Sequence, residues 1–350
     1  MYLLYTCIPV YLPKNTMNRL SLSIIGCGDI AGFTALVSKL VPQATLSACC
    51  DVNAEKARAF AKRHRIPQTF TDYQLLLEKS SAGAVYLAVP HHLHCEMILA
   101  AVRAGKSVFV EKPLTRTFAE AKKLIEEIGD AKVGVNYQYR YDSGCYALAR
   151  AVQSGALGKV HSMRINVPWH RGQNYFDGAA WHRTVAAAGG GTLITQGSHF
   201  LDAALWALND APVSAMGYAR TPLFDVEVDT LTHGIVETRS GTLISVVSSM
   251  VAATEQKVTM EAYGERGTAV YADRPLPHVK FIGAKIRRER PPEWGIHALQ
   301  RSLAGFANWV LNDKPFLTPA ASALPVLAAV DGMYRSAETG RKSQVESLSA

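Results

Sequence analysis

Short apolar runs alternate with helical stretches between Ser21 and Gln138, and this alternation constrains the fold more than any other feature of the chain. The runs are continuous in hydrophobicity, which is typical of strands covered on both faces of a parallel sheet. Repeated strand–helix units of this length predict a doubly wound parallel sheet. The expected strands are Leu22–Ile25, Leu46–Cys50, Ala84–Val89, Ser107–Val110 and Lys132–Asn136, and the expected helices are Ala31–Leu40, Ala54–Arg63, His94–Ala104 and Phe118–Ile128.

A different pattern begins after about Arg140, where long β-rich stretches are joined by tight turns. The turns Arg239-Ser240-Gly241 and Gly264-Glu265-Arg266-Gly267 suit hairpins in an antiparallel sheet. A length of 350 residues favours two domains, here of different architecture. The expected strands are Lys159–Val167, Thr230–Thr238, Thr242–Met250, Lys257–Tyr263 and Ala269–Ala272, and the expected helices are Tyr146–Gln153, Thr195–Leu208, Leu299–Leu311 and Ala320–Ser336.

The composition narrows the class of protein. Hydrophobic residues make up 48% and charged residues 19%, so a large core is available and disorder is not expected. The formal net charge of +8 fits an anionic ligand such as a dinucleotide or a nucleotide sugar. There is no arginine-rich helix, zinc-finger spacing or RNA-binding aromatic signature, so no nucleic-acid partner is expected. The basic run from Lys285 to Arg290 is expected to be a solvated loop.

The cysteines and the N-terminal segment bear on the cellular compartment. Six cysteines occur without a Cys-x-x-Cys spacing and mostly inside expected strands or helices, which predicts reduced thiols in a cytoplasmic protein. The first 16 residues are apolar and aromatic, but they lack a basic leader and are too short to span a bilayer. We expect a start codon placed too far upstream, with Met17 as the natural start, and no association with a membrane.

The first expected strand ends in a glycine-rich turn that opens the first helix. The pattern is G-x-G-x-x-A: Gly26 allows the tight turn, Gly28 the close approach of a pyrophosphate, and Ala31 the packing of helix on strand. The helix N-terminus then offers amide groups and a partial positive charge to the phosphates. The residues expected to bind a dinucleotide at this turn are Gly26, Cys27, Gly28, Asp29 and Ile30.

An acidic residue, Asp51, follows the second expected strand. A carboxylate there accepts hydrogen bonds from the adenosine ribose hydroxyls and repels a 2′-phosphate, which favours NAD over NADP. The alternative is that Asp51 only caps the helix that begins at Ala54, a role that Asn53 could also fill.

A charged pair, Glu111 and Lys112, closes a buried strand and precedes Pro113. Such a pair is costly unless it has partners or a function, and ligands bind at the carboxyl ends of strands in open α/β sheets. Lys112 could therefore lie beside a bound dinucleotide. The alternative is a surface strand end with a solvated lysine.

Three segments after the glycine turn carry a resemblance to a known family. They are Ala88-Val89-Pro90-His91-His92-Leu93-His94, Glu111-Lys112-Pro113, and Gly189 to Asp202 with Thr195-Gln196-Gly197-Ser198-His199. In this order they resemble the Gfo/Idh/MocA family, the relatives of glucose–fructose oxidoreductase and inositol dehydrogenase. The resemblance runs from about Leu20 to Arg341 and includes the tail from Tyr334.

The resemblance implies the fold in more detail. It implies an α/β chain with an N-terminal Rossmann dinucleotide-binding domain plus a C-terminal α+β domain with a large, mostly antiparallel open sheet. We expect an N-terminal extension at residues 1–18, an NAD-binding Rossmann domain at 19–139, and a domain for substrate binding and oligomerisation at 140–350. The C-terminal sheet often forms an oligomer interface in the family, so a homodimer or homotetramer is expected.

The resemblance also implies site residues. Lys112 and His199 flank the nicotinamide and the substrate, and the Lys112–Pro113 bond is cis. Asn136, Gln138 and Arg140 match an Asn-x-Gln-x-Arg stretch that faces the cleft. Further cofactor contacts are expected at Pro90, His94, Glu111, Lys112 and Gln138. Substrate contacts are expected at Lys112, Arg140, Arg171, Trp181, Arg183, Thr195, Gln196 and His199.

Oxidation of a secondary alcohol independently requires such a pair of residues. A positioned base takes the hydroxyl proton, and a cation stabilises the developing alkoxide. We assign His199 as the main acid/base and Lys112 as the oxyanion stabiliser and proton-relay partner, and the reverse assignment stays open. Asp202, three residues further along the helix, is expected to orient the imidazole. The alternative for His199 is a core histidine whose hydrogen bonds are satisfied.

The segment from Trp169 to Arg183 combines aromatic and basic side chains. Aromatic faces pack on sugar rings and arginine binds hydroxyls, carboxylates or phosphates, so we expect substrate contacts here; the alternative is a structured loop on the sheet. Thr195 departs from the family pattern, which often has Asp or Asn there, and the Gln196 form resembles a sugar-modifying branch. His91 and His94 have no acid or cysteine to complete a set, so no metal is expected.

The sequence therefore predicts an NAD(P)-dependent oxidoreductase, with NAD favoured, that interconverts a secondary hydroxyl and a ketone on a sugar, sugar acid, cyclitol or nucleotide sugar. The net charge, with Arg171 and Arg183, mildly favours an anionic substrate such as a uronate or a UDP-sugar. One alternative is an NAD-dependent glycoside-cleaving enzyme of the same fold, which oxidises its substrate transiently to permit elimination. The other is a non-catalytic ligand-binding relative, against which the joint presence of Lys112, His199 and Asp51 argues.

Overall fold

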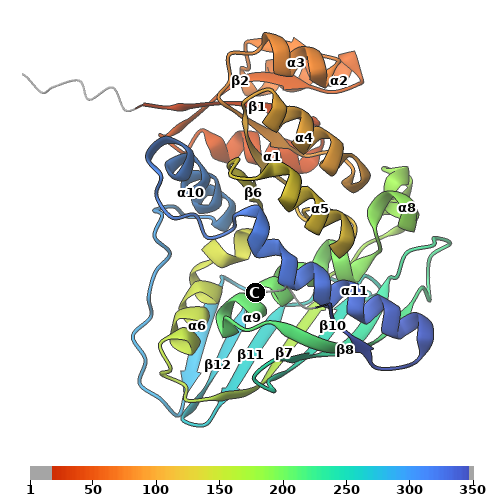
Figure 1. The fold of residues 1–350 in the computed structure, drawn as a ribbon, viewed down its shortest axis with the longest axis vertical. Coiled ribbons are helices and arrows are strands. Elements are labelled where there is room, and N and C mark those ends of the chain that lie inside the picture. Colours follow the sequence, from red (N-terminus) through yellow and green to blue (C-terminus); the bar gives the residue numbers. More distant parts are fainter. Residues whose placement is uncertain (1–17, 347–350) are drawn as a thin grey trace, which may run out of the picture.

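The computed structural model describes residues 18–346, and its N-terminal half contains a six-stranded parallel sheet in the order β3-β2-β1-β4-β5-β6 (Figure 1). The strand order reverses between β1 and β4, as expected for a dinucleotide-binding sheet, so the predicted Rossmann architecture is confirmed. The strands are β1 (Leu20–Ile25), β2 (Ala44–Cys50), β3 (Gln68–Phe70), β4 (Ala84–Leu87), β5 (Ser107–Val110) and β6 (Val133–Val135).

Helices connect these strands, and three of them begin at a side-chain cap. Asn53, Asp72 and Thr117 each accept hydrogen bonds from backbone amides of the first turn that follows. The helices are α1 (Asp29–Ser38), α2 (Ala54–His64), α3 (Tyr73–Lys79), α4 (His94–Arg103) and α5 (Phe118–Ile128). The sequence did not indicate β3 or α3, because β3 is short and mostly exposed and so lacks a continuous apolar run.

The second sheet has eight strands in the order β13-β12-β11-β7-β10-β9-β8-β14. Every described neighbouring pair is antiparallel except β7 and β10, so the prediction of a mostly antiparallel sheet is confirmed. The strands are β7 (Val160–Pro168), β8 (Pro212–Arg220), β9 (Leu231–Thr238), β10 (Leu243–Ser249), β11 (Thr259–Gly264), β12 (Gly267–Ala272), β13 (His278–Ile282) and β14 (Ser343–Gln344).

Three long helices cover the face of this sheet that points toward the N-terminal domain (Figure 1). They are α6 (Ser143–Gln153), α9 (Ser198–Leu208) and α11 (Leu324–Thr339). Helix α11 packs closely on β8 and β9 because Gly217 and Gly234 lack side chains; a Cβ on Gly217 would lie 2.8 Å from the carbonyl oxygen of Met333. The short elements between β7 and α9 are α7 (Gln173–Asp177), a 3-10 helical turn (Ala180–Arg183), α8 (Val185–Ala188) and a π-helical turn (Leu193–Gly197).

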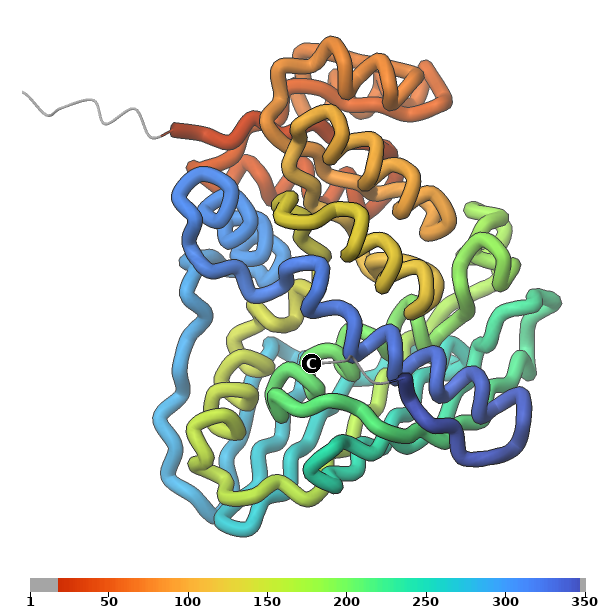
Figure 2. Tube along the Cα trace, viewed as in Figure 1, coloured from red at the N-terminus to blue at the C-terminus, as the bar shows by residue number. Residues whose placement is uncertain are grey.

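Helix α10 (Ala298–Asn312) lies late in the sequence but packs against the N-terminal domain (Figure 2). Phe306 stacks on Phe109 of β5 at 4.9 Å between ring centroids, and Leu303 joins the same core as Leu22 and Ile24 of β1. The expected assignment of residues 140–350 to the second domain therefore differs from the packing, because α10 belongs to the core of the first.

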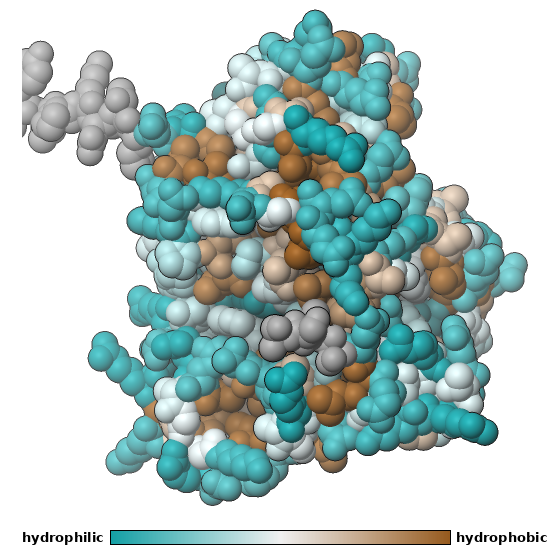
Figure 3. Space-filling view, viewed as in Figure 1, coloured by the Kyte–Doolittle hydropathy of each residue, from teal (hydrophilic) through white to brown (hydrophobic). Residues whose placement is uncertain are grey.

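The expected extension at residues 1–18 and the proposed start at Met17 lie outside the described residues, apart from residue 18. Within residues 18–346, no helix is both long and apolar enough to cross a membrane. On the face in Figure 3, polar side chains predominate and apolar patches are separated from one another.

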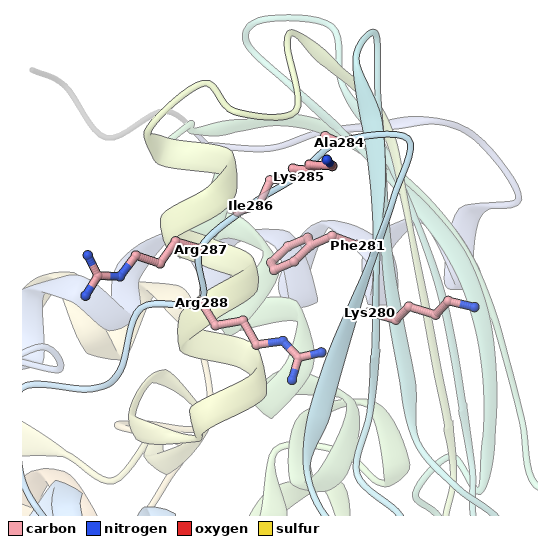
Figure 4. Close-up of a pocket in the computed structure, with 7 residues that line it drawn as sticks. All are labelled: Lys280, Phe281, Ala284, Lys285, Ile286, Arg287 and Arg288. Carbon is pink, nitrogen blue, oxygen red and sulfur yellow. The ribbon is translucent and has the colours of Figure 1, made fainter.

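The basic run after β13 forms an irregular exposed segment that borders an open depression. Figure 4 shows Phe281 pointing toward α6, whereas Lys280 points away from it. Phe281 and Ile286 pack on the core, while the neighbouring Arg287 and Arg288 are exposed. Apolar side chains thus hold the segment in place, and its charges face solvent.

Candidate active site

The turn between β1 and α1 has the backbone that a dinucleotide requires. Gly26 has φ +90°, and a Cβ there would lie 2.2 Å from the carbonyl oxygen of Ala88. A Cβ on Gly28 would meet nothing within 4 Å, and a pocket opens beside Cys27, Gly28 and Asp29. Because α1 begins without a side-chain cap, its first amides remain available for an anion. These residues fit a bound pyrophosphate.

Asp51 lies at the end of β2 and is tied to this turn. Its Oδ2 accepts a hydrogen bond from the amide of Cys27 at 3.0 Å, and its Oδ1 accepts one from the amide of Asn53 at 3.0 Å. Lys56 forms an ion pair with the same carboxylate at 3.4 Å. The cap of α2 is Asn53, so the structure gives the capping role to that residue. Asp51 instead fixes the glycine turn and stays near the ribose position expected at this strand end.

Lys112 reaches from the end of β5 to the second domain. Its Nζ donates a hydrogen bond to the carbonyl oxygen of Thr195, and the Lys112–Pro113 bond is cis, as expected. Burial lowers the pKa of Lys112 to about 8; the charge of Arg171 adds to this effect and that of Glu111 opposes it. Lys112 is therefore a partly buried amine held between the two domains, not a solvated lysine at a strand end.

Glu111 faces the opposite way, into the N-terminal core. Its carboxylate accepts hydrogen bonds from the Tyr86 hydroxyl and from Nδ2 of Asn136 at 2.7 Å. The Ser302 hydroxyl of α10 donates to Asn136 Oδ1 at 3.1 Å and extends this network. Burial raises the pKa of Glu111 despite these donors. Its side chain is occupied by the protein itself, which differs from the expected contact with the cofactor.

His199 lies near the start of α9 and is 6% exposed. Its ring meets Tyr139 edge-on at 5.1 Å between centroids, and Tyr137 and Trp169 lie further out at 6.2 and 6.4 Å. Nδ1 is buried and has no hydrogen-bond partner among the described residues. Burial, followed by the charge of Lys112, lowers the pKa of His199 well below its usual value, so the ring is neutral near pH 7.

The expected pairing of Asp202 with His199 is wrong, and so is the expected exposure of Arg140 to the cleft. Arg140 donates Nε and Nη2 to the two carboxylate oxygens of Asp202, at 2.8 and 2.6 Å. It also donates to the carbonyl oxygens of Leu317 and Ser322, at 2.8 and 3.0 Å. The two side chains are 6% and 1% exposed, so the pair is a buried structural tie rather than a substrate contact.

Asp229, which the sequence did not single out, holds the turn before His199. Its carboxylate accepts hydrogen bonds from the amides of Gly191 (2.6 Å) and Leu193 (3.1 Å) and from the Tyr334 hydroxyl (2.8 Å). A Cβ on Gly191 would lie 1.7 Å from the carbonyl oxygen of Asp229, so only glycine fits there. The glycine run was a visible signal, but nothing local to Asp229 or Tyr334 marks them as its partners.

Thr195 and Gln196 lie in a π-helical turn, not in the regular helix expected from Thr195 onward. The Thr195 hydroxyl donates to the carbonyl oxygen of Gly191 at 2.6 Å. Gln196 accepts a hydrogen bond from the Thr192 hydroxyl at 3.2 Å, while its Nε2 is buried without a partner in the described chain. Single π-helical turns often occur at functional sites. Here the turn presents the Thr195 carbonyl to Lys112.

Two of the three histidines after β4, His91 and His94, are buried and have backbone carbonyl oxygens as partners. His94 is fully buried, and its ring nitrogens lie 2.9 Å from the carbonyl oxygen of Pro113 and 3.1 Å from that of Val89. His91 Nδ1 lies 2.7 Å from the carbonyl oxygen of Ala188. Burial lowers the pKa of both histidines. Within residues 18–346, no cluster of three or more metal-binding side chains occurs.

The remaining predicted residues fall into two groups. Pro90 precedes the short helical turn at His91–Leu93, which follows β4. Gln138 is the first residue of a second short helical turn, which follows β6, and its buried Oε1 has no hydrogen-bond partner among residues 18–346. Arg183 instead forms an ion pair with Asp177 at 3.1 Å and donates to the carbonyl oxygen of Asp225. Arg183 thus ties its own loop together, and within residues 18–346 no hydrogen bond or ion pair joins it to Lys112.

Aromatic and basic side chains cluster in the segment after β7, and the charge of Arg171 in this cluster acts on Lys112. The Trp181 and His182 rings lie 3.7 Å apart, and His182 stacks on Tyr175 at 4.2 Å. Arg171 lies over the ring of Tyr175 at 5.5 Å. Burial lowers the pKa of His182 to about 4, and the charges of Lys112 and Arg171 act in the same direction. Of the residues expected near the substrate, Thr195 is joined to Lys112 by a hydrogen bond, and the pKa shifts link Lys112 to Arg171 and His199.

The fold and this site define an NAD-binding oxidoreductase. One family model, the NAD-binding Rossmann fold of an oxidoreductase family, matches residues 20–139, and a second, the GFO/IDH/MocA C-terminal domain, matches residues 145–270. Together the two models span more than half of the chain. The chain belongs to the Gfo/Idh/MocA family.

Several known proteins are similar to this chain over much of its length. Inositol 2-dehydrogenase of Rubrobacter xylanophilus is 29% identical over 261 residues, which cover 73% of this chain and 72% of that protein. The 1,5-anhydro-D-fructose reductase of Ensifer adhaerens is 24% identical over 341 residues, covering 94% and 99%. The WlbA dehydrogenase of Bordetella pertussis, crystallised with NADH and UDP-GlcNAcA, matches with a TM-score of 0.82 at 23% identity, covering 95% of this chain and 100% of that one.

Proposed function

We propose that this protein is an NAD-dependent dehydrogenase that interconverts a secondary hydroxyl and a ketone on a sugar, sugar acid, cyclitol or nucleotide sugar. The observation that carries the proposal is the position of Lys112. This amine extends from the cofactor-binding sheet to the Thr195 carbonyl and acts electrostatically on His199 of the second domain. Relatives named for inositol and anhydrofructose support a polyhydroxylated substrate.

The chain's residues divide the roles around the bound cofactor. Gly26, Gly28 and the first amides of α1 would hold the pyrophosphate, and Asp51 the adenosine ribose. A bound nicotinamide would supply the acceptor for the hydride that leaves the carbinol carbon. The protein then has to remove the hydroxyl proton and stabilise the charge that develops on the oxygen.

We assign the proton to Lys112 rather than to His199, which reverses the first assignment of roles. A pKa of about 8 leaves part of Lys112 neutral near physiological pH, so its Nζ can accept the hydroxyl proton and later release it to solvent. The pKa of His199 lies well below its usual value, and no carboxylate among residues 18–346 is hydrogen-bonded to its ring, because Asp202 is bound to Arg140. The neutral imidazole instead orients the hydroxyl through a hydrogen bond.

The test is a panel of sugars, cyclitols and UDP-sugars scored for NADH formation by absorbance. We expect Lys112→Ala and His199→Ala each to lower turnover by roughly two orders of magnitude or more, with Lys112→Ala the more severe. Lys122→Ala and His161→Ala, both at exposed positions, are the matched controls and should retain activity. NADH binding should survive in all four variants. Near-normal turnover in both Lys112→Ala and His199→Ala would contradict the proposal.

The arrangement of the chain also supports an oligomer. The outer face of the second sheet exposes Met216, Tyr218 and Ile235, with 38%, 55% and 47% of each side chain accessible. We propose that a homodimer or homotetramer forms over this face. We also propose that residues 140–297 together with α11 bind the substrate. The compartment that we propose for the protein is the cytoplasm. A monomer by light scattering at micromolar concentration would contradict the oligomer.

A further inference from the structure

Arg171 is fixed at the edge of the site before any substrate arrives. Its backbone amide donates to the carbonyl oxygen of Met250 at 3.2 Å, which anchors the residue just after β7. Its guanidinium lies over two aromatic rings, Trp169 at 5.7 Å and Tyr175 at 5.5 Å. Such stacking holds a planar cation in one orientation and leaves the N–H groups at its edge free to bind a ligand.

No side chain within the described part of the chain neutralises the charge of Arg171. Within residues 18–346, no ion pair joins Arg171 to a carboxylate, and its one side-chain hydrogen bond goes to the carbonyl oxygen of His170 at 2.7 Å. The other two arginines expected to bind substrate differ in this respect. Arg140 is paired with Asp202, and Arg183 is paired with Asp177. Of the three, only Arg171 keeps a free positive charge.

The groups around Arg171 make the site still more favourable to an anion. The charge of Arg171 lowers the pKa of Lys112 and that of His182, although burial is the larger cause for both. His182 stacks on Tyr175, the same ring that Arg171 covers. Below its pKa of about 8 Lys112 is mostly protonated, so it adds a second positive charge near Arg171.

We propose that the substrate carries an anionic group, a carboxylate or a phosphate, near the hydroxyl that is oxidised, and that Arg171 is the residue that selects for it. This inference rests on the proposed function and specifies its substrate class. An arginine edge binds a carboxylate or a phosphate through two parallel hydrogen bonds. Because the aromatic rings hold the guanidinium in place, little side-chain entropy is lost on binding.

The test compares compounds that share one sugar ring and differ in the anion. D-Glucose is the neutral reference; D-glucuronate carries a carboxylate, D-glucose 6-phosphate a phosphate and UDP-glucose a diphosphate, and the galactose series repeats the set. The readout is the ratio of kcat/KM for each anionic member to that for its neutral reference. We expect at least one anionic arm to exceed its reference by about 10- to 100-fold, the range for a hydrogen-bonded charge pair.

Arg171→Gln should reduce that ratio by a similar factor, mainly through KM. Arg164→Gln is the matched control, since Arg164 is 62% exposed on β7 and pairs with Glu261, and it should leave the ratio unchanged. Equal or better oxidation of the neutral members by the wild type would overturn this inference while leaving the proposed function intact. Loss of NADH affinity in Arg171→Gln would also overturn it, because the guanidinium would then serve the cofactor. Failure of every compound would overturn both proposals.

Discussion

Replacing Arg140 by methionine should destabilise the fold without a specific effect on substrate affinity. Methionine keeps much of the side-chain volume but removes the guanidinium that bonds to both oxygens of Asp202. The variant leaves an almost fully buried carboxylate without its partner, and the carbonyl oxygens of Leu317 and Ser322 lose their donor. Breaking a buried ion pair in this way costs about 3–5 kcal/mol.

A double-mutant cycle separates the pair from its surroundings. Asp202→Leu alone should also cost about 3–5 kcal/mol because it leaves Arg140 buried without a counter-charge, whereas the double variant replaces both charges by apolar groups and should cost less than the two single changes together. A coupling of about 2 kcal/mol or more is expected. Urea unfolding followed by circular dichroism and by tryptophan fluorescence gives these values where the two transitions coincide.

If Arg140→Met leaves the urea midpoint unchanged and raises KM for a panel sugar by an order of magnitude, Arg140 binds substrate and the assignment from the structure fails. A large fall in the midpoint with an unchanged KM supports the structural tie.

Four further outcomes are expected. In the oxidative direction kcat/KM should rise with pH through a midpoint at about 8, because Lys112 must be neutral to accept a proton. Ketone reduction should fall over the same range, and flat profiles would contradict the role. Asp51→Ala should lower the affinity for NADH, measured by fluorescence titration, and reduce the ratio of the affinity for NADH to that for NADPH. Burial raises the pKa of Asp331 to about 6, so the ionised carboxylate lowers the free energy of unfolding as pH rises through that value. Asp331→Asn should therefore raise the free energy of unfolding, and with it the melting temperature, more at pH 8 than at pH 5, by about 1–3 kcal/mol at most. Tyr334→Phe removes one donor to Asp229 and should cost about 1–2 kcal/mol and lower kcat, whereas unchanged kcat would show that the turn is held without it.

The sequence predicted the parts of this protein whose cause is local. The turn from Gly26 to Gly28 joins consecutive elements and needs one backbone conformation, so the glycines alone reveal it. Ser107–Val110 was predicted with its bounds because a short, continuous apolar run has one reading in an alternating pattern. The cis bond before Pro113 and the position of Lys112 followed from the family resemblance.

The contacts that were missed join residues far apart in the chain. Asp202 is three residues from His199, a spacing that suggested a pair, but its partner Arg140 is 62 residues away. Asp229 and Tyr334 meet across 105 residues, at the turn of Gly191. Side-chain spacing on one helix says which residues share a face, not which distant group offers the better hydrogen bond. Strand β8 was missed since it begins with Pro212 and contains Gly217, both of which weaken a strand pattern.

The return of α10 to the first domain bears on how such proteins can exchange parts. Cutting the chain near residue 139 would strip Phe306 and Leu303 from the sheet and leave Phe109 and Ile24 open to water. Moving the second domain between relatives therefore takes three junctions, one before α6, one before α10 and one between α10 and α11, because α10 has to stay with the first domain. Recombination at a single point would yield chimeras in which α10 and the first domain come from different relatives, so that the core they share would not match.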